Sequence, residues 1–262
     1  MLLVIDCGNT NTGFAVYEDT NCVGSWRTST NTRRTADEYA VWLKQLLALK
    51  SLVINDIKGI IIANVVPETS FNLINLCERY FEIRPMVVGK TGVDLGIIID
   101  IDDPNEVGAD RVVNAVGALD RYTGSLIVVD FGTATTFDVV DADGTYRGGV
   151  IAPGINLSLE ALYNAAARLP RISISETKNS GAPINLLNVI GKSTKAAMHS
   201  GIFWGYIGLI EGIVNRIKNE FAKPMTVIGT GGLANIFYDA TDSIDHIDED
   251  ITNAGLVLIY KR

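Results

Sequence analysis

A sixteen-residue pattern occurs twice in this chain, at residues 4–19 and 128–143. The two stretches align without gaps, 124 residues apart. Each reads as an apolar strand, a polar turn containing glycine and a second strand, which is the pattern of a β-hairpin. Two hairpins can look alike by chance, but duplication of a half-chain explains more of the matched positions. The matched pairs are Asp6 with Asp130, Gly8 with Gly132, and Thr12 with Thr136.

The repeat predicts an α/β protein of two similar halves, and 262 residues suit that division. No low-complexity or proline-rich linker separates the halves, so the repeat alone sets the boundary, with one half at 1–120 and the other at 121–262. Helical periodicity over 35–50 predicts a helix with Thr35 as its N-cap, and a second helix is expected from about 106 to 120.

Composition excludes several classes of function. A net charge of −8 and a pI near 4.8 disfavour nucleic-acid binding, which needs a basic surface. Three irregularly spaced cysteines and two distant histidines form neither a disulfide framework nor a zinc motif. No stretch reaches the ~20 apolar residues of a membrane span, and no basic segment precedes the first apolar run. We therefore expect a cytoplasmic protein that binds neither nucleic acid nor membranes.

Glycine-rich turns follow three predicted strands: DCGNT (6–10), DFGTATT (130–136) and GTGGLA (229–234). Turns of this kind let backbone N–H groups approach phosphate oxygens. Asp6 and Asp130 would supply carboxylates to a phosphate-bound cation, although such residues also cap strands for structural reasons alone. Neither a GxxxxGK[ST] loop nor a GxGxxG turn after the first strand is present. The three turns together predict a site for a nucleotide triphosphate.

The ordered turns resemble those of the actin/hexokinase/chaperone-ATPase superfamily, and nearly the whole chain resembles one of its families, the type III pantothenate kinases. EVGADR (106–111) and DFGTATTFD (130–138) are the most specific strings. Further matches are DCGNTNT (6–12), WRTSTNTRRTADEY (26–39), GGVIAPG (148–154), LPR (169–171) and SGIFWGYIGLIEG (200–212).

The resemblance implies two RNase H-like halves of the actin-like ATPase type, with a nucleotide cleft between them. It also implies ATP-dependent phosphorylation of pantothenate, the first step of coenzyme A synthesis. The family needs Mg²⁺ and a monovalent cation, K⁺ or NH₄⁺, and forms homodimers with the active site at the interface. The partners expected from it are ATP, pantothenate and a second copy of the chain.

Residue roles carry over by position. The resemblance implies that Asp110 is the catalytic base. It also implies that Asp130 binds the monovalent cation and that Asp6 binds Mg²⁺, directly or through water. The expected ATP contacts are Asp6, Cys7, Gly8, Asn9, Thr10, Asn11, Thr12, Gly13 and Thr133. The expected pantothenate contacts are Ile101, Gly108, Ala109, Asp110, Arg111 and, across the dimer interface, Thr194.

Simpler interpretations remain for several of these residues. Asp110 can cap the helix that begins near it, and Thr194 can be a helix N-cap. Arg33 and Arg34 fit either a phosphate clamp or exposed charge on a loop. The apolar faces of 202–217 fit either a large core or a dimer interface.

The sequence departs from the family pattern on the acceptor side. Ile101 replaces a common tyrosine, Ala166 replaces a frequent threonine, and about nine residues are inserted near 179–187. These changes leave two alternatives open. One is a kinase of the same fold for another small alcohol. The other is a non-catalytic accessory protein that binds a nucleotide, against which the joint presence of Asp6, Asp110 and Asp130 argues.

Overall fold

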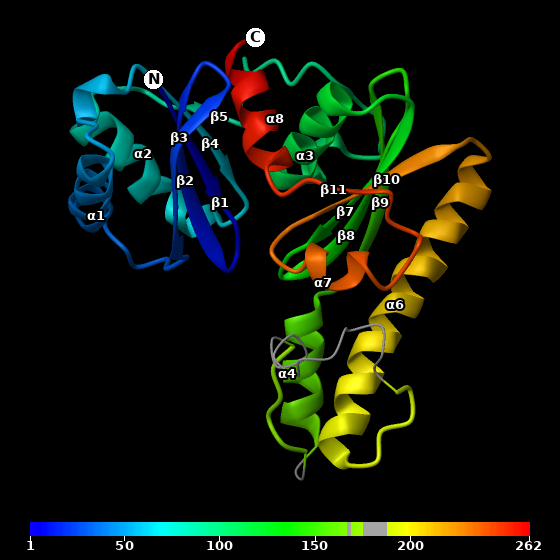
Figure 1. Cartoon of the computed structure of the whole chain (residues 1–262). Coiled ribbons are helices and arrows are strands. Elements are labelled where there is room, and N and C mark those ends of the chain that lie inside the picture. The colour runs from blue at the N-terminus through cyan, green and yellow to red at the C-terminus, as the bar shows by residue number, and fades with distance from the viewer. Residues whose placement is uncertain (167–168, 175–187) are drawn as a thin grey trace. The chain divides into compact units, whose positions relative to one another are not determined.

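The computed structural model describes residues 1–166, 169–174 and 188–262. The chain divides into two compact units (Figure 1). The first unit contains Met1–Arg121 and Asp250–Arg262, and the second contains Tyr122–Glu249.

The first unit is built on a sheet with the order β3-β2-β1-β4-β5. Strands β1 to β3 form an antiparallel meander, whereas β4 and β5 run parallel to β1. The carboxyl ends of β1 and β4 therefore lie at the same edge. The strands are β1 (Leu2–Cys7), β2 (Asn11–Glu18), β3 (Asn21–Ser29), β4 (Gly59–Asn64) and β5 (Met86–Val87).

Helices cover both faces of this sheet because alternate side chains of β1 point in opposite directions. Leu3 and Ile5 pack in a core with α1 and α2, whereas Leu2 and Val4 pack in a separate core with α3 and α8 (Figure 1). The helices are α1 (Ala36–Leu49), α2 (Ser70–Tyr80), α3 (Ala109–Arg121) and α8 (Ile251–Tyr260). Short elements complete this part of the chain: β6 (Ile98–Ile99) and 3₁₀ turns at Ile54–Asp56, Pro67–Thr69 and Pro104–Glu106.

The predicted start of the first helix is confirmed. The hydroxyl of Thr35 accepts a hydrogen bond from the backbone N–H of Glu38, and the Glu38 carboxylate accepts one from the backbone N–H of Thr35. This reciprocal pair is a capping box, which satisfies two of the N–H groups left over at a helix start. The cap thereby fixes where the segment that follows β3 enters α1.

The second unit repeats the strand order of the first. Its strands follow the order β9-β8-β7-β10-β11, with an antiparallel meander from β7 to β9 and parallel pairing of β10 with β7 and β11. The predicted fold class of two similar α/β halves is therefore confirmed. The strands are β7 (Ser125–Phe131), β8 (Ala134–Val140), β9 (Thr145–Pro153), β10 (Met225–Thr230) and β11 (His246–Ile247).

Helices α4 (Ile155–Ala165), α6 (Thr194–Phe221) and α7 (Ala234–Tyr238) belong to this unit. They share a core with one face of β7 and β8, in which Phe203 and Phe237 are fully buried. Helix α4 and the first half of α6 lie side by side and continue beyond the sheet of this unit (Figure 1). The predicted insertion near 179–187 lies outside the described residues.

The two hairpins differ by one residue, which corrects the gapless alignment. Asp6 pairs with Gly13 in the first hairpin, whereas Asp130 pairs with Thr136 in the second. A one-residue shift in register reverses the face of every following side chain. Thr12 is thus equivalent to Thr135 rather than to Thr136, and both Thr12 and Thr135 are buried. The second turn is one residue shorter than the first.

The last helix packs with the first unit. The boundary set by the sequence repeat places residues 250–262 in the second half, but α8 contacts α3, β1 and β4. Glycines allow α8 to approach α3 closely: a Cβ at Gly117 would lie 2.2 Å from the carbonyl oxygen of Ile251, and one at Gly255 would lie 2.1 Å from that of Val113. The chain therefore returns to its first unit at its end. In the described part of the chain, no helix combines the length and apolarity needed to cross a membrane.

Candidate active site

The first turn, residues 7–12, connects β1 to β2. The backbone N–H of Gly8 donates a hydrogen bond to the carbonyl oxygen of Asn11 (3.0 Å), which closes the turn. Cys7 and Thr12 at its base are fully buried, whereas Asn9, Thr10 and Asn11 are exposed at its tip. Asp6 is half-buried at the end of β1, next to Gly13 on β2. The turn thus offers exposed backbone beside a carboxylate that the sheet holds in place.

The segment around Asp110 lies near the same edge of the sheet. The N–H of Val65, just after β4, donates to the carbonyl oxygen of Cys7 (3.1 Å). A Cβ at Gly108 would lie 3.8 Å from Cγ1 of Val65. The first turn and the start of α3 therefore both contact the end of β4, although they are more than ninety residues apart in the sequence.

Asp110 is half-buried in the first turn of α3. Its Oδ1 accepts a hydrogen bond from the backbone N–H of Arg111 (2.8 Å). Burial raises the pKa of Asp110 above its ordinary value, and the N–H and guanidinium groups of Arg111 oppose that rise. A carboxylate with a raised pKa is a better proton acceptor than an ordinary surface aspartate. Gly108, Ala109, Arg111 and Ile101 are also half-buried.

The second turn, residues 131–135, connects β7 to β8. The N–H of Gly132 donates to the carbonyl oxygen of Ala134 (3.0 Å). Gly154, just before α4, donates its N–H to the carbonyl oxygen of Thr133 (3.1 Å). Thr133 is exposed, and Asp130 is half-buried at the end of β7. The start of α4 is therefore held against the second turn.

The third turn, residues 229–234, packs directly on Asp130. Gly231 has φ = 89°, which disfavours any residue with a side chain. A Cβ at Gly231 would lie 2.6 Å from Oδ1 of Asp130. The missing side chain lets the third turn lie directly against Asp130 and against the backbone of Phe131, whose N and O atoms would each lie 2.8 Å from that Cβ.

No group of three or more His, Cys, Asp or Glu side chains arranged for a metal is present in the described ranges. Asp6 and Asp130 each offer a single carboxylate at the end of a strand. Mg²⁺ commonly takes one or two carboxylates and completes its shell with water and substrate phosphates. The residues present fit cations that bind together with a nucleotide.

Thr194 is the first residue of α6 and is exposed. The N-cap is Ser193, whose hydroxyl accepts a hydrogen bond from the N–H of Ala196 (3.1 Å). The interpretation of Thr194 as an N-cap is therefore wrong. Its proposed contact with pantothenate stays a prediction.

Arg34 is held by aromatic residues. Its guanidinium lies 5.0 Å from the ring centre of Tyr39 and 5.7 Å from that of Trp42, and it donates to the hydroxyl of Thr28. Cation–π contacts of this kind anchor the loop that leads into α1. Arg33 is exposed. The arrangement favours a structural role for Arg34.

The structure groups the predicted residues by unit. In the first unit, Asp6–Gly13 and Gly108–Arg111 lie at the end of the β1–β4 pair. In the second, Asp130 and Thr133 lie beside the third turn and Gly154. Two neighbours of the first turn were missed as site residues: Thr30 and Asn64. Asn64 pairs with Cys7 across the parallel strands β1 and β4, a register that periodicity within the sequence does not give.

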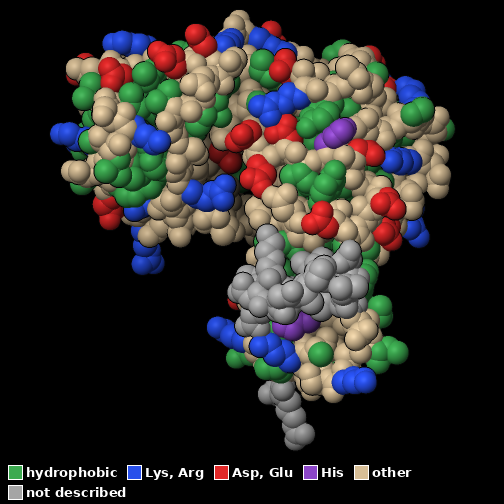
Figure 2. Space-filling view, in the orientation of Figure 1, with side chains coloured by type: hydrophobic (Ala, Val, Ile, Leu, Met, Phe, Trp, Pro, Cys, Tyr) green, Lys and Arg blue, Asp and Glu red, His purple; other side chains and the backbone are tan. Residues whose placement is uncertain are grey.

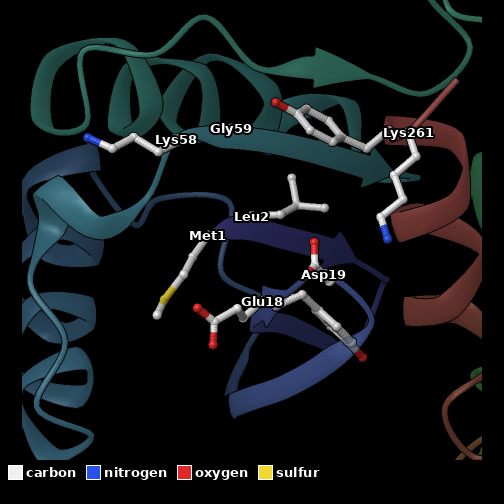
Figure 3. A pocket seen from close by; sticks show the side chains of 9 residues that line it. Met1, Leu2, Glu18, Asp19, Lys58, Gly59 and Lys261 are labelled. Carbon is white, nitrogen blue, oxygen red and sulfur yellow. The ribbon is translucent and has the colours of Figure 1, made fainter.

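A pocket elsewhere in the first unit is unrelated to these turns. It is lined by residues at the starts of β1 and β4, including Leu2, Lys58 and Gly59, and by Lys261 (Figure 3). These positions are at the opposite end of β1 from the first turn. On the face shown in Figure 2, basic and acidic side chains are interspersed over each unit.

Comparison with known proteins points to one family. The family model for type III pantothenate kinase matches residues 2–216. A type III pantothenate kinase of Rhodospirillum rubrum is 58% identical over 262 residues, covering all of this chain and 98% of its own. One from Caulobacter vibrioides is 54% identical over 262 residues, covering all of this chain and 97% of its own.

Solved structures support the fold. A structure from Campylobacter jejuni, described as a putative Baf family transcriptional activator, aligns with a TM-score of 0.61 at 18% identity, covering 99% of this chain and 97% of its own. A putative 2-dehydro-3-deoxygalactonokinase from Sinorhizobium meliloti aligns with a TM-score of 0.55 at 18% identity, covering all of this chain and 96% of its own. Likenesses at such identities concern the fold alone, and they agree with the predicted actin-like architecture.

Proposed function

Because this chain belongs to the type III pantothenate kinase family, we propose that it transfers the γ-phosphoryl group of ATP to the terminal hydroxyl of pantothenate, the first step of coenzyme A synthesis. One observation of the structure carries the proposal furthest. Asp110, with its raised pKa, lies at the start of α3, near the strand edge from which the first turn emerges. A candidate proton acceptor and a candidate phosphate-binding turn therefore share one edge of the sheet.

Asp110 acts on the acceptor in this proposal. Phosphoryl transfer depends mainly on positioning and charge neutralisation, and it needs one group to take the proton of the attacking hydroxyl. The carboxylate of Asp110 accepts that proton as the new oxygen–phosphorus bond forms and the bond from the γ-phosphorus to the β–γ bridging oxygen breaks, which leaves ADP. Arg111 suits the carboxylate of pantothenate, since a guanidinium pairs with a carboxylate as a planar fork. Gly108, Ala109 and Ile101 complete the acceptor side, together with Thr194 contributed across the dimer interface by a second copy of the chain.

The phosphates are bound by turns rather than by a basic surface. Residues Asp6–Gly13 and Thr133 offer backbone and hydroxyl donors to them. Asp130 would hold K⁺ (or NH₄⁺), and Asp6 would hold Mg²⁺ directly or through water. When bound, these cations supply the positive charge that the acidic chain lacks.

The test measures ADP formation by the full chain with and without pantothenate, in buffers containing K⁺, NH₄⁺ or Na⁺ and with Mg²⁺ throughout. We expect turnover that depends on pantothenate and is stimulated by K⁺ or NH₄⁺ relative to Na⁺. A panel of other small alcohols serves as the acceptor control, because Ile101 and Ala166 alter the expected acceptor side. Absence of pantothenate-dependent turnover in every cation would contradict the proposal. Equal turnover in K⁺ and Na⁺ would contradict only the proposed site for a monovalent cation at Asp130 and would leave the kinase activity unaffected.

We also propose a homodimer through α4 and α6. A Cβ added at Gly201, Gly205 or Gly208 of α6 would meet no atom within 4 Å. On α4, Leu157 is 48% exposed and Leu162 is 38% exposed. Small residues and exposed leucines on neighbouring helices suit close packing against a second copy.

Sedimentation equilibrium at micromolar protein should give twice the chain mass of 28.3 kDa. Gly205→Trp places a large side chain in the open space and should shift the equilibrium toward monomer. The exposed substitution Lys44→Trp on α1 controls for the added indole. A monomeric natural protein, or an unaffected dimer in Gly205→Trp, would contradict this interface.

A further inference from the structure

Thr30 immediately follows β3 and makes three hydrogen bonds to the first turn. Its N–H donates to the carbonyl oxygen of Thr10 (3.0 Å), and its hydroxyl donates to the carbonyl oxygen of Gly8 (2.6 Å). Its Oγ1 also lies 2.9 Å from Oγ1 of Thr12. A hydroxyl carries one hydrogen, so the Thr30 oxygen accepts the bond from Thr12 while donating to Gly8. One residue thus binds both sides of the turn.

These bonds decide which backbone groups the turn can offer to a ligand. A phosphate-binding turn must present N–H groups, because a carbonyl oxygen facing a phosphate repels it. Thr30 binds the carbonyl oxygens of Gly8 and Thr10. In a trans peptide the C=O and the next N–H point in opposite directions. Holding the Gly8 carbonyl toward Thr30 therefore directs the N–H of Asn9 away from Thr30, at the exposed tip of the turn.

The surroundings of Thr30 keep it in place. On one side it continues β3, whose Thr28 pairs with Thr12 of β2. On the other side the loop is closed by a hydrogen bond from the N–H of Arg34 to the carbonyl oxygen of Asn31 (3.1 Å). The stacking of Arg34 on Tyr39 anchors that loop to α1. A group held this way needs no rearrangement when a ligand binds, which is what preorganisation requires.

We propose that Thr30 is the positioning residue of the first turn, whose hydroxyl sets the Gly8–Asn9 peptide so that it binds the phosphates of the nucleotide. Thr30 acts through the turn and touches neither substrate. The inference rests on the proposed function only in taking the first turn as the nucleotide site. It gives the segment at 26–39 a role in nucleotide binding, whereas the proposed chemistry uses no residue of that segment.

The test compares Thr30→Val, which keeps the shape and removes the hydroxyl, with Thr30→Ser, which keeps the hydroxyl. A lost hydrogen bond of this kind corresponds to a roughly 3- to 10-fold change in an equilibrium constant. We expect Thr30→Val to raise KM for ATP by about that factor and to leave KM for pantothenate unchanged. Thr30→Ser should behave like the natural protein. Calorimetric titration with a non-hydrolysable ATP analogue should give the same factor in Kd without any turnover.

Thr252→Val is the matched control. Thr252 is half-buried in the first unit, as Thr30 is, and its hydroxyl donates to Oδ1 of Asn114 (2.6 Å) rather than to the first turn. This variant should lose stability but keep its affinity for the analogue. If Thr30→Val does not fold, Thr30→Ala and Thr30→Ser are compared by the same titration.

Two results would overturn the assignment of Thr30. One is analogue binding by Thr30→Val or Thr30→Ala that equals that of the natural protein. The other is an equal loss of affinity in Thr30→Ser, which would make the methyl group rather than the hydroxyl responsible. Because the titration measures binding alone, its outcome is separate from whether pantothenate is the acceptor.

Discussion

Asp110→Asn should lose about two to four orders of magnitude in kcat/KM for pantothenate, the usual contribution of a general base. The amide keeps the size of the side chain but cannot accept the hydroxyl proton. Affinity for the ATP analogue should stay within about twofold, because the proposed role of Asp110 concerns the acceptor. Steady-state kinetics and titration with the analogue measure the two quantities separately.

The same substitution should leave the protein as stable at neutral pH, or more stable. Burial raises the pKa of Asp110, so the folded chain binds its proton more tightly than the unfolded chain does. Its contribution to stability is therefore full below the unfolded pKa and is lost as the pH rises through the folded pKa. At pH 7 the charged carboxylate opposes folding, and Asn removes that charge. Loss of activity with an unchanged or raised Tm separates a catalytic group from a structural one.

The pH profile gives a further check on Asp110. Activity of the natural protein should fall on the acid side at a pH above the ordinary aspartate pKa of about 3.9. Asp120→Asn, an exposed carboxylate on the same helix, is the control and should change neither activity nor the profile. Full turnover in Asp110→Asn would show that Asp110 is not the general base. A large fall in Tm would indicate that the residue is structural instead.

Local chemistry made much of the first unit predictable from sequence. The capping box at Thr35 depends on residues three apart, and the helix start follows from it directly. The apolar run at the start of the chain predicts the first strand, and the structure has β1 there. The parallel pairing of β1 with β4, which brings their carboxyl ends to one edge, is a finding of the structure.

Other features depend on contacts between distant segments, and sequence periodicity does not report these. The gapless repeat was wrong by one residue after the turn, because a turn can lose a residue while both strands keep their apolar pattern. Thr30 was part of a recognised motif, but its bonds to Gly8 and Thr10 involve backbone atoms, which leave no residue signature. The packing of α8 with the first unit could not be read from residues 250–262, since their apolar pattern fits either half.

The close approach of α3 and α8 leads to the second large expected effect, that of Gly117→Val. Backbone atoms lie where the new side chain must go: even a Cβ at Gly117 would lie 2.2 Å from the carbonyl oxygen of Ile251 and 3.1 Å from the N of Gly255. Backbone yields less readily than the end of a flexible side chain, so the helices must separate. Overpacking typically costs about 1–3 kcal/mol and occasionally more. A branched residue against backbone belongs at the upper end, near 3 kcal/mol.

Thermal unfolding of Gly117→Val should therefore show a Tm lower by roughly 6–12 °C, from about 2–4 °C per kcal/mol in a chain of this size. Ala48→Val, at an exposed position of α1, is the control, since the same branched side chain there meets solvent rather than backbone. Because α3 carries Asp110 at its start, separating α3 from α8 also moves the proposed base. We expect kcat for pantothenate to fall more than the folded fraction does. A Gly117→Val protein with natural Tm and natural kcat would show that the two helices tolerate separation, and that the position of Asp110 does not depend on α8.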